Sequence, residues 1–208
     1  MTFIQSYLKK NLRPIRFHIL VAAMIFFAVA VITSVIMREN IDRLIGIINE
    51  VAPEFDLEDL EEFAGIENFT GLNAMVFYFL NNSRSFLVTM FGGIVLFFPF
   101  LALFVNAALV GIIEPLITAE TGIETWAFYL YGILPHGILE IPTFFIAAAV
   151  GMKIAKDIVI RPKTAKRTDR LRENFLLGIR LLPLLFIMLF LAAFIEAFIT
   201  PMIIERFL

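Results

Sequence analysis

The run HILVAAMIFFAVAVITSVIM, residues 18–37, decides the fold of this chain. After its first residue it contains no charged side chain. In a helix that rises ~1.5 Å per residue, a run of this length covers the ~30 Å of hydrocarbon in a bilayer. A cleaved signal peptide has an apolar core of only ~7–15 residues. We therefore interpret the run as an uncleaved membrane-spanning helix. Four basic residues precede it: Lys9, Lys10, Arg13 and Arg16.

The composition of the whole chain agrees with this interpretation. Of the 208 residues, 60% are hydrophobic and 14% are aromatic, and the mean hydropathy is +0.89. Soluble domains are usually about 45–50% apolar. The chain contains no cysteine, which excludes a disulfide framework and a thiol-ligated metal. The composition predicts an all-α, polytopic transmembrane helical bundle.

The hydropathy pattern predicts about five spans within a single membrane domain, residues 1–208. Residues 71–117 form one apolar stretch that is too long for a single crossing, so we expect Gly92, Gly93 and Pro99 to break it. Three acidic residues are expected in a loop around Gly122: Glu114, Glu120 and Glu124. The approximate spans are 18–37, 74–98, 100–117, 128–152 and 175–199.

The distribution of charge predicts the topology. Residues 38–70 are acidic, with apolar positions near helical spacing that predict short amphipathic helices against the membrane. Residues 153–172 form a strongly basic loop. Because cytoplasmic loops carry excess Lys and Arg, the N-terminus and residues 153–172 are expected in the cytoplasm, which requires four crossings between them. The protein is then a multi-pass cell-membrane protein with residues 38–70 and the C-terminus outside.

Several polar residues fall inside these spans, where inserting a charged group costs about 2.5–3.5 kcal/mol at a helix centre. They are therefore expected to face the bundle interior, water or one another. Arg180, near the inner end of the last span, is expected to extend to the interface instead. The candidate site residues are His136, Glu140, Glu196, Asn81, Asn82, Arg84 and Asn106.

A histidine and a glutamate lie four residues apart in LPHGILEIPTFF, residues 134–145. In a regular helix this spacing places both on one face. Pro142 removes an amide donor, and Pro135 and Gly137 loosen the preceding turn. We expect the fourth span to be kinked or broken at Pro135/Pro142, with freed backbone groups near the two side chains.

On the five-span topology, Glu196 and the polar residues of the second span converge with His136 and Glu140 in the outer half of the membrane. Two interpretations remain open. In the first, Glu140 and Glu196 pair with His136 and Arg84 in a structural network that fixes how the helices pack. In the second, the cluster is a binding or translocation site for a proton, an ion or a lipid-like solute.

Other chemistries have weaker support. One histidine with two scattered carboxylates lacks the dense spacing of a zinc signature, so we expect no metal and no other cofactor. The sequence has no Ser/His/Asp order, no paired aspartates on adjacent spans and no HExxH. We therefore expect no enzymatic activity. It has no Walker sequence or other glycine-rich phosphate loop, and nothing in it indicates nucleic-acid binding.

Small residues four apart predict two close helix contacts, at Ala107 with Gly111 and at Ala147 with Gly151. Contacts within one chain are favoured, and a homodimer is the alternative. The basic residues 153–172 are interpreted first as a topology determinant and second as a site for anionic lipid headgroups or a cytoplasmic partner. The expected partners are membrane lipid and other membrane or envelope proteins.

The chain resembles the family of the stage II sporulation protein M, small membrane proteins of bacteria and archaea. The resemblance runs from the second span to Pro201. It rests on the asparagine pair Asn81–Asn82, on Asn106, on PHGILEIPTFFIAAAVGMKI from Pro135, and on IEAFITP from Ile195. The family often has a glycine after the asparagine of the third span, where this chain has Ala107.

This resemblance implies a five-span membrane protein without enzymatic activity of its own. In endospore formers the family's namesake looks like a scaffold that recruits two peptidoglycan-degrading partners during engulfment, but the resemblance does not imply sporulation. We expect an integral membrane scaffold or assembly protein. The alternative is a transport component, a small carrier or a permease-like subunit working as a dimer, that uses His136, Glu140 and Glu196 as its ion or solute site.

Overall fold

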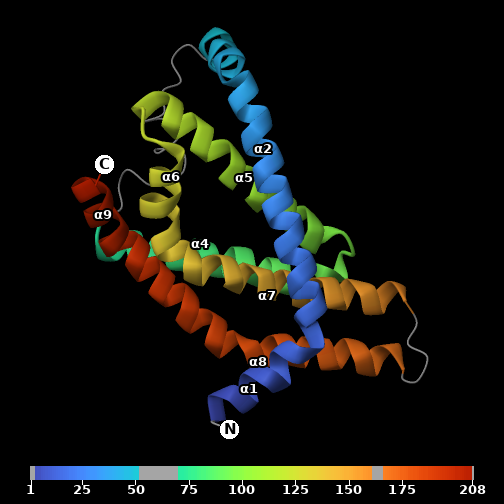
Figure 1. The fold of residues 1–208 in the computed structure, drawn as a ribbon. Coiled ribbons are helices and arrows are strands. Elements are labelled where there is room, and N and C mark those ends of the chain that lie inside the picture. Colours follow the sequence, from blue (N-terminus) through green and yellow to red (C-terminus); the bar gives the residue numbers. More distant parts are fainter. Residues whose placement is uncertain (1–2, 52–69, 161–165, 208) are drawn as a thin grey trace.

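A computed structural model of the chain describes residues 3–51, 70–160 and 166–207, and all regular structure in these ranges is helical (Figure 1). Long apolar runs without strand-like alternation account for this, because each run satisfies its own backbone hydrogen bonds in a helix. The helices are α1 (Phe3–Leu12), α2 (Arg16–Val51), α4 (Leu72–Phe91), α5 (Phe98–Thr121), α6 (Thr125–Ala127), α7 (Leu134–Val159), α8 (Arg167–Phe194) and α9 (Thr200–Phe207). Two 3₁₀ turns, η1 (Arg13–Ile15) and η2 (Gly92–Ile94), and two π-helical segments, η3 (Phe128–Ile133) and η4 (Ile195–Ile199), connect them.

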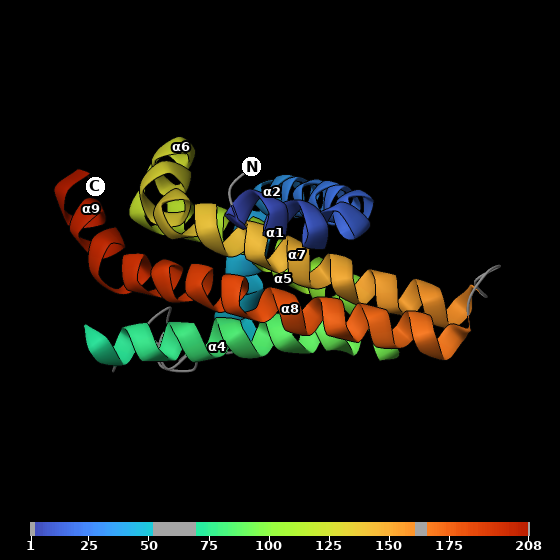
Figure 2. The same cartoon turned by 90° about the horizontal axis from the view of Figure 1, so that it is seen from below.

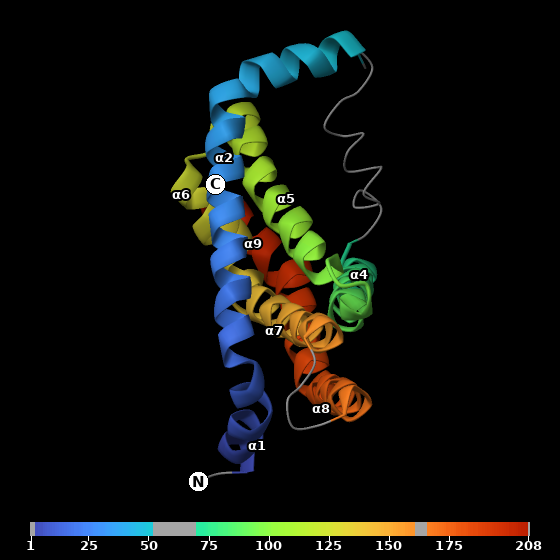
Figure 3. The same ribbon diagram turned by 90° about the vertical axis from the view of Figure 1, so that its right-hand side faces the viewer.

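The long helices form two groups. Helices α4, α7 and α8 run side by side as a three-helix bundle in which each contacts the other two, as Figure 1 and Figure 2 show from two directions. Helices α2 and α5 pack against each other and cross this bundle steeply (Figure 3). Helix α1 is separated from α2 by the 3₁₀ turn that contains Pro14 and contacts α8. The five long helices thus meet where the α2–α5 pair crosses the three-helix bundle.

Glycine allows the closest helix contacts. A Cβ on Gly111 of α5 would lie 2.4 Å from the backbone oxygen of Ala30 in α2. A Cβ on Gly93 would lie 2.1 Å from the backbone oxygen of Gly151 in α7. A Cβ on Gly151 would in turn lie 2.4 Å from the backbone oxygen of Thr89 in α4. The predicted close contacts within one chain are confirmed for both glycines of the small-residue pairs.

The membrane character of the chain is confirmed, and the predicted number of five crossings stays a prediction. Among the described residues, four helical stretches are long and apolar enough to cross a membrane: Gln5–Ile41, Phe98–Ala119, Thr125–Val159 and Arg167–Phe207. Helix α4 is not among them. Its centre is the polar sequence NNSRS, residues 81–85, which lowers the hydropathy of a helix only 20 residues long.

Helix ends also differ from the predicted ones. The first span was expected to end near residue 37, but α2 continues to Val51, because no proline or strong breaker follows in the sequence until Pro53. Residues 153–172 are not a loop throughout: α7 runs to Val159 and α8 begins at Arg167. Most of the expected amphipathic segment, residues 52–69, lies outside the described residues. Glu114, expected in a loop, lies within α5.

The predicted break in the fourth span is present at Pro135 but not at Pro142. The chain changes direction between η3 and α7, as Figure 1 shows, and Pro135 stands in the first turn of α7. The fixed φ of proline suits the first turn of an α-helix. Pro142 lies inside α7, which continues past it to Val159. Gly137 is buried in the same helix.

Candidate functional site

The two π-helical segments bring together the residues that the sequence singled out. Segment η3 leads into the turn of α7 that carries His136, and η4 contains Glu196. Segment η4 contacts α7 and α4, and α9 contacts η3. A π-helical turn has one residue more than an α-turn, which displaces side chains from the regular register, and such turns are frequent at functional sites. The local irregularity of the backbone is therefore concentrated at the ionisable residues.

His136, Glu140 and Glu196 form a compact cluster. One donor atom from each side chain, an imidazole nitrogen or a carboxylate oxygen, lies within 4.8 Å of those of the other two. His136 and Glu140 are one turn apart on α7, so the spacing prediction is confirmed for these two residues. All three side chains are partly buried. Nδ1 of His136 and Oε2 of Glu196 are buried and have no hydrogen-bond partner in the described part of the chain.

A small cavity adjoins this cluster at the centre of the molecule. Its volume is about 90 Å³, and each of the five long helices contributes to its wall. Glu140 belongs to both the cavity wall and the cluster. The other polar residues in the cavity wall are Asn82, Ser85 and Asn106. The amide nitrogen of Asn106 donates a 2.8 Å hydrogen bond to the carbonyl oxygen of Ala102, one turn earlier in α5.

The remaining predicted site residues lie elsewhere. The side chains of Asn81 and Arg84 are exposed on α4, so the expected pairing of the glutamates with Arg84 is not present. Helical geometry explains the difference: Asn82 and Ser85 share a face of α4 that borders the cavity, whereas Asn81 and Arg84, three residues apart, share an exposed face. Arg180 is exposed, and its Nε donates a 3.2 Å hydrogen bond to Oδ1 of Asn11 in α1.

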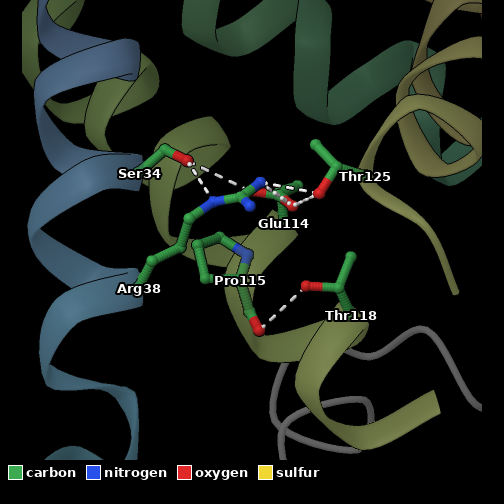
Figure 4. Close-up of polar contacts among 6 residues, drawn as sticks. All are labelled: Ser34, Arg38, Glu114, Pro115, Thr118 and Thr125. Atoms are coloured by element: carbon green, nitrogen blue, oxygen red, sulfur yellow. Dashed lines mark hydrogen bonds and ion pairs between the residues drawn. The ribbon is translucent and has the colours of Figure 1, made fainter. Parts of the chain in front are cut away.

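Sequence reasoning missed a second buried carboxylate, Glu114, whose side chain is completely inaccessible. Arg38 of α2 forms an ion pair with its Oε1 (Figure 4). Thr125 donates a 2.9 Å hydrogen bond to the same oxygen, and Ser34 donates a 3.1 Å hydrogen bond to Oε2. Arg38 also donates to the hydroxyls of Thr125, at 2.8 Å, and Ser34, at 3.4 Å. Both carboxylate oxygens of Glu114 are therefore hydrogen-bonded.

One sequence signal was available for Glu114. It follows Ala107 by seven residues and Gly111 by three, so it continues the face of α5 that carries the small residues. That face packs against α2, and a carboxylate on it requires a donor from α2. Arg38 lies one turn after Ser34 in α2, and both reach it. The assignment of Glu114 to a loop hid this relation.

The fold and the cluster together define a class: a helical membrane protein with titratable side chains buried where its helices cross. The family model described as "Stage II sporulation protein M" matches residues 19–201, most of the chain, and the protein belongs to this family. No curated protein and no solved structure shows a significant match to the chain.

Proposed function

We propose that the protein is a non-enzymatic integral membrane scaffold or assembly factor that binds other membrane proteins through α2. The supporting observation is an apolar stripe on α2 whose side chains stay at least half exposed, although the ring of one member, Phe27, also touches Phe145 of α7. Its members recur every three or four residues and are 50–67% exposed. The stripe consists of Phe17, Leu20, Met24, Phe27, Val31 and Val35.

The spacing of this stripe favours a helical partner. Residues that alternate in steps of three and four keep one face of a helix toward a neighbouring helix over several turns. The opposite face of α2 is already used, since Ala22, Phe26 and Ala30 belong to a buried cluster with residues of α5 and α7. In the most apolar segment of the first membrane-spanning stretch, Gln5–Ile41, 11% of the residues are buried within the chain. The corresponding share in the stretch that contains α7 is 61%. Helix α2 therefore has the larger surface for lipid or a partner.

The interior supports a scaffold more than a carrier of large solutes. The central cavity of about 90 Å³ has room for a few water molecules at most. The backbone contacts of Gly151 in α7 with Thr89 of α4 and with Gly93 of η2 leave no space for a side chain there. Such close packing suits a protein that presents a fixed surface.

Photo-crosslinking from α2 tests the scaffold role. A benzophenone amino acid in place of Phe27, 55% exposed, should give discrete protein adducts in native membranes. The same probe in place of the neighbouring Phe26, 4% exposed, is the matched control and should give none. The Phe27 probe should also give no protein adducts when the purified protein is alone in liposomes. Adducts with lipid only, in native membranes, would contradict the scaffold role.

The second candidate is a transport component for a proton or a small ion. The observation that favours it is the position of Glu140, which connects the central cavity to His136 and Glu196. A buried carboxylate next to a polar cavity is a common element of proton and ion pathways. If this role is correct, proteoliposomes should show a proton or cation flux that Glu140→Gln abolishes and that Glu205→Gln, an exposed change in α9, leaves intact. Equal flux with and without the protein would exclude it.

We also propose that the N-terminus is cytoplasmic and the C-terminus is outside. This orientation places both basic segments in the cytoplasm, and it requires α4 to cross the membrane although its hydropathy is low. The chain has no cysteine, so single cysteines can be introduced without removing any. Cysteines at Lys10 and Arg167 should be labelled from the cytoplasmic side, and one at Glu205 from the outside. Labelling of Lys10 and Arg167 from opposite sides would show that α4 does not cross.

A further inference from the structure

We propose that His136, Glu140 and Glu196 bind one divalent transition-metal ion, of which Zn²⁺ is the first candidate. The sequence alone did not favour a metal, because Glu196 is 56 positions after Glu140 in the chain. The fold removes this objection, since a donor atom from each of the three residues lies within 4.8 Å of the other two. The proposal does not depend on the scaffold role.

The donor set has the chemistry of a divalent site. An imidazole nitrogen with two carboxylate oxygens matches the ligands that Zn²⁺ and similar ions take in proteins. A histidine and a glutamate four residues apart on one helix direct both donors to the same side, as the two histidines of helical zinc motifs do. The third ligand then comes from a distant segment, which is here η4.

Charge balance gives the site a reason to hold a cation. Two carboxylates close together in a mostly apolar interior repel each other and lose hydration. The one basic side chain that the sequence offered as their counter-ion, Arg84, is exposed on α4. A divalent ion would neutralise both carboxylates, and the imidazole would remain neutral. The complex would carry no net charge, which is the least costly state at this depth.

Two atoms of the cluster, each of an element that ligates metal ions, are buried without a protein partner among the described residues. Nδ1 of His136 and Oε2 of Glu196 are buried without hydrogen-bond partners in the described part of the chain. Buried polar atoms normally have a hydrogen-bond partner, so two such atoms without one at the same place require an explanation, such as a bound ion. At Glu114, by contrast, every carboxylate oxygen has a protein donor.

The three ligand atoms need to move only slightly closer together to hold a metal ion. Ligand atoms around a tetrahedral zinc ion with bonds of ~2.0–2.1 Å are separated by ~3.3 Å. The ligand atoms of the cluster lie within 4.8 Å of one another, so side-chain rotations that move each atom by about an ångström bring them into range. Glu140 also faces the cavity lined by Asn82 and Asn106. Three protein ligands leave one coordination position, and the cavity has room for the water that would occupy it.

Metal analysis of the purified full-length protein tests the proposal. The protein should carry a non-histidine affinity tag and be stripped with a chelator, and Zn²⁺ should then be titrated in detergent or nanodiscs. We expect one ion per chain and an increase in the thermal unfolding temperature on binding. His136→Gln, Glu140→Gln and Glu196→Gln should each weaken binding at least about 100-fold, beyond the loss seen for outer-shell residues. Failure of the unaltered protein to bind stoichiometric Zn²⁺, Co²⁺ or Mn²⁺ would overturn the proposal.

The chain offers a matched histidine control. It has only two histidines, and His18, on α2, is not part of the cluster. His18→Gln and Glu205→Gln should retain the full affinity, and loss of binding in His18→Gln would overturn the assignment. Should a cluster variant fail to fold, X-ray absorption of the Zn²⁺-loaded unaltered protein decides the question. One imidazole and otherwise oxygen ligands support the site, whereas two or no imidazoles would refute it.

Discussion

The molecule contains two buried carboxylate regions that solve the same electrostatic problem differently. At the contact of α2 with α5, Glu114 is completely inaccessible and is paired with Arg38, Ser34 and Thr125. At the contact of α7 with η4, Glu140 and Glu196 lie together beside His136, with unpaired atoms in the cluster. In the first region, side chains of the protein supply a hydrogen-bond partner for each carboxylate oxygen. In the second region, buried polar atoms have no partner among the described residues.

The difference indicates different roles. A carboxylate whose oxygens are all bonded to side chains of neighbouring helices stabilises one arrangement of those helices. A cluster with unpaired buried polar atoms beside a polar cavity lowers stability unless something binds to it. Residues that reduce stability without serving packing are expected at functional sites. The comparison therefore favours a structural role for Glu114, and it agrees with the binding role that we propose for the cluster.

The largest change in stability is expected from removing the ion pair of Arg38 with Glu114. Arg38→Met should lower the free energy of unfolding by about 2–3 kcal/mol, because it leaves a fully buried carboxylate without its counter-ion. The value is below the ~3–5 kcal/mol of a fully buried pair because the Arg38 side chain is 45% exposed. Arg84→Met, on the exposed face of α4, is the control and should change stability by less than ~0.5 kcal/mol. Reversible unfolding in mixed micelles measures both, and equal effects would contradict the contrast.

The unpaired region should respond in the opposite direction. In chelator-treated protein, Glu140→Gln should raise the free energy of unfolding by about 1 kcal/mol, because it removes one of two adjacent charges from the interior. Glu114→Gln should lower the free energy of unfolding by a similar amount, since it removes the charge that Arg38 compensates. Thermal unfolding of the metal-free variants gives the comparison. A loss of stability in Glu140→Gln would mean that this carboxylate has a partner within the protein.

The smallest effects are expected from a matched pair of buried serines. Ser34→Ala should lower the free energy of unfolding by about 1 kcal/mol, because Oε2 of Glu114 loses a hydrogen bond. Ser83→Ala, in α4, should be neutral or slightly stabilising, since the hydroxyl of Ser83 is buried without a partner in the described residues. The two changes remove the same atom from equally buried positions. If Ser83→Ala is the more destabilising change, the distinction between satisfied and unsatisfied sites fails.

The sequence was sufficient for the membrane class, the family and part of the cluster. His136 and Glu140 follow from a spacing of four on one helix, and Glu196 was expected near them because both segments approach the same end of the bundle. The positions of Asn81 and Arg84 could not be derived, since the rotation of α4 about its axis depends on contacts with α7 and α8. The π-helical segments η3 and η4 leave no sequence pattern that we recognise.

The ion pair of Glu114 with Arg38 was not predicted from the sequence, for a related reason. Acidic residues near the end of an apolar run are usually assigned to the following loop, and only the position of α2 shows that a donor is available. Arg38 closes the first apolar run and was treated as its boundary. Its long side chain instead reaches a neighbouring helix.

The contact of Gly151 with Thr89 has a mechanical consequence. Because a Cβ on Gly151 of α7 would lie 2.4 Å from the backbone oxygen of Thr89 in α4, these two helices cannot rotate or slide past each other without separating. The parts of the cavity wall that α4 and α7 supply therefore stay together with His136 and Glu140. Glu196 belongs to a different part, joined to α8 and α9 through the irregular turns of η4. Any rearrangement that admits or releases a bound species should therefore displace η4 and α9 and leave the contact of α4 with α7 unchanged.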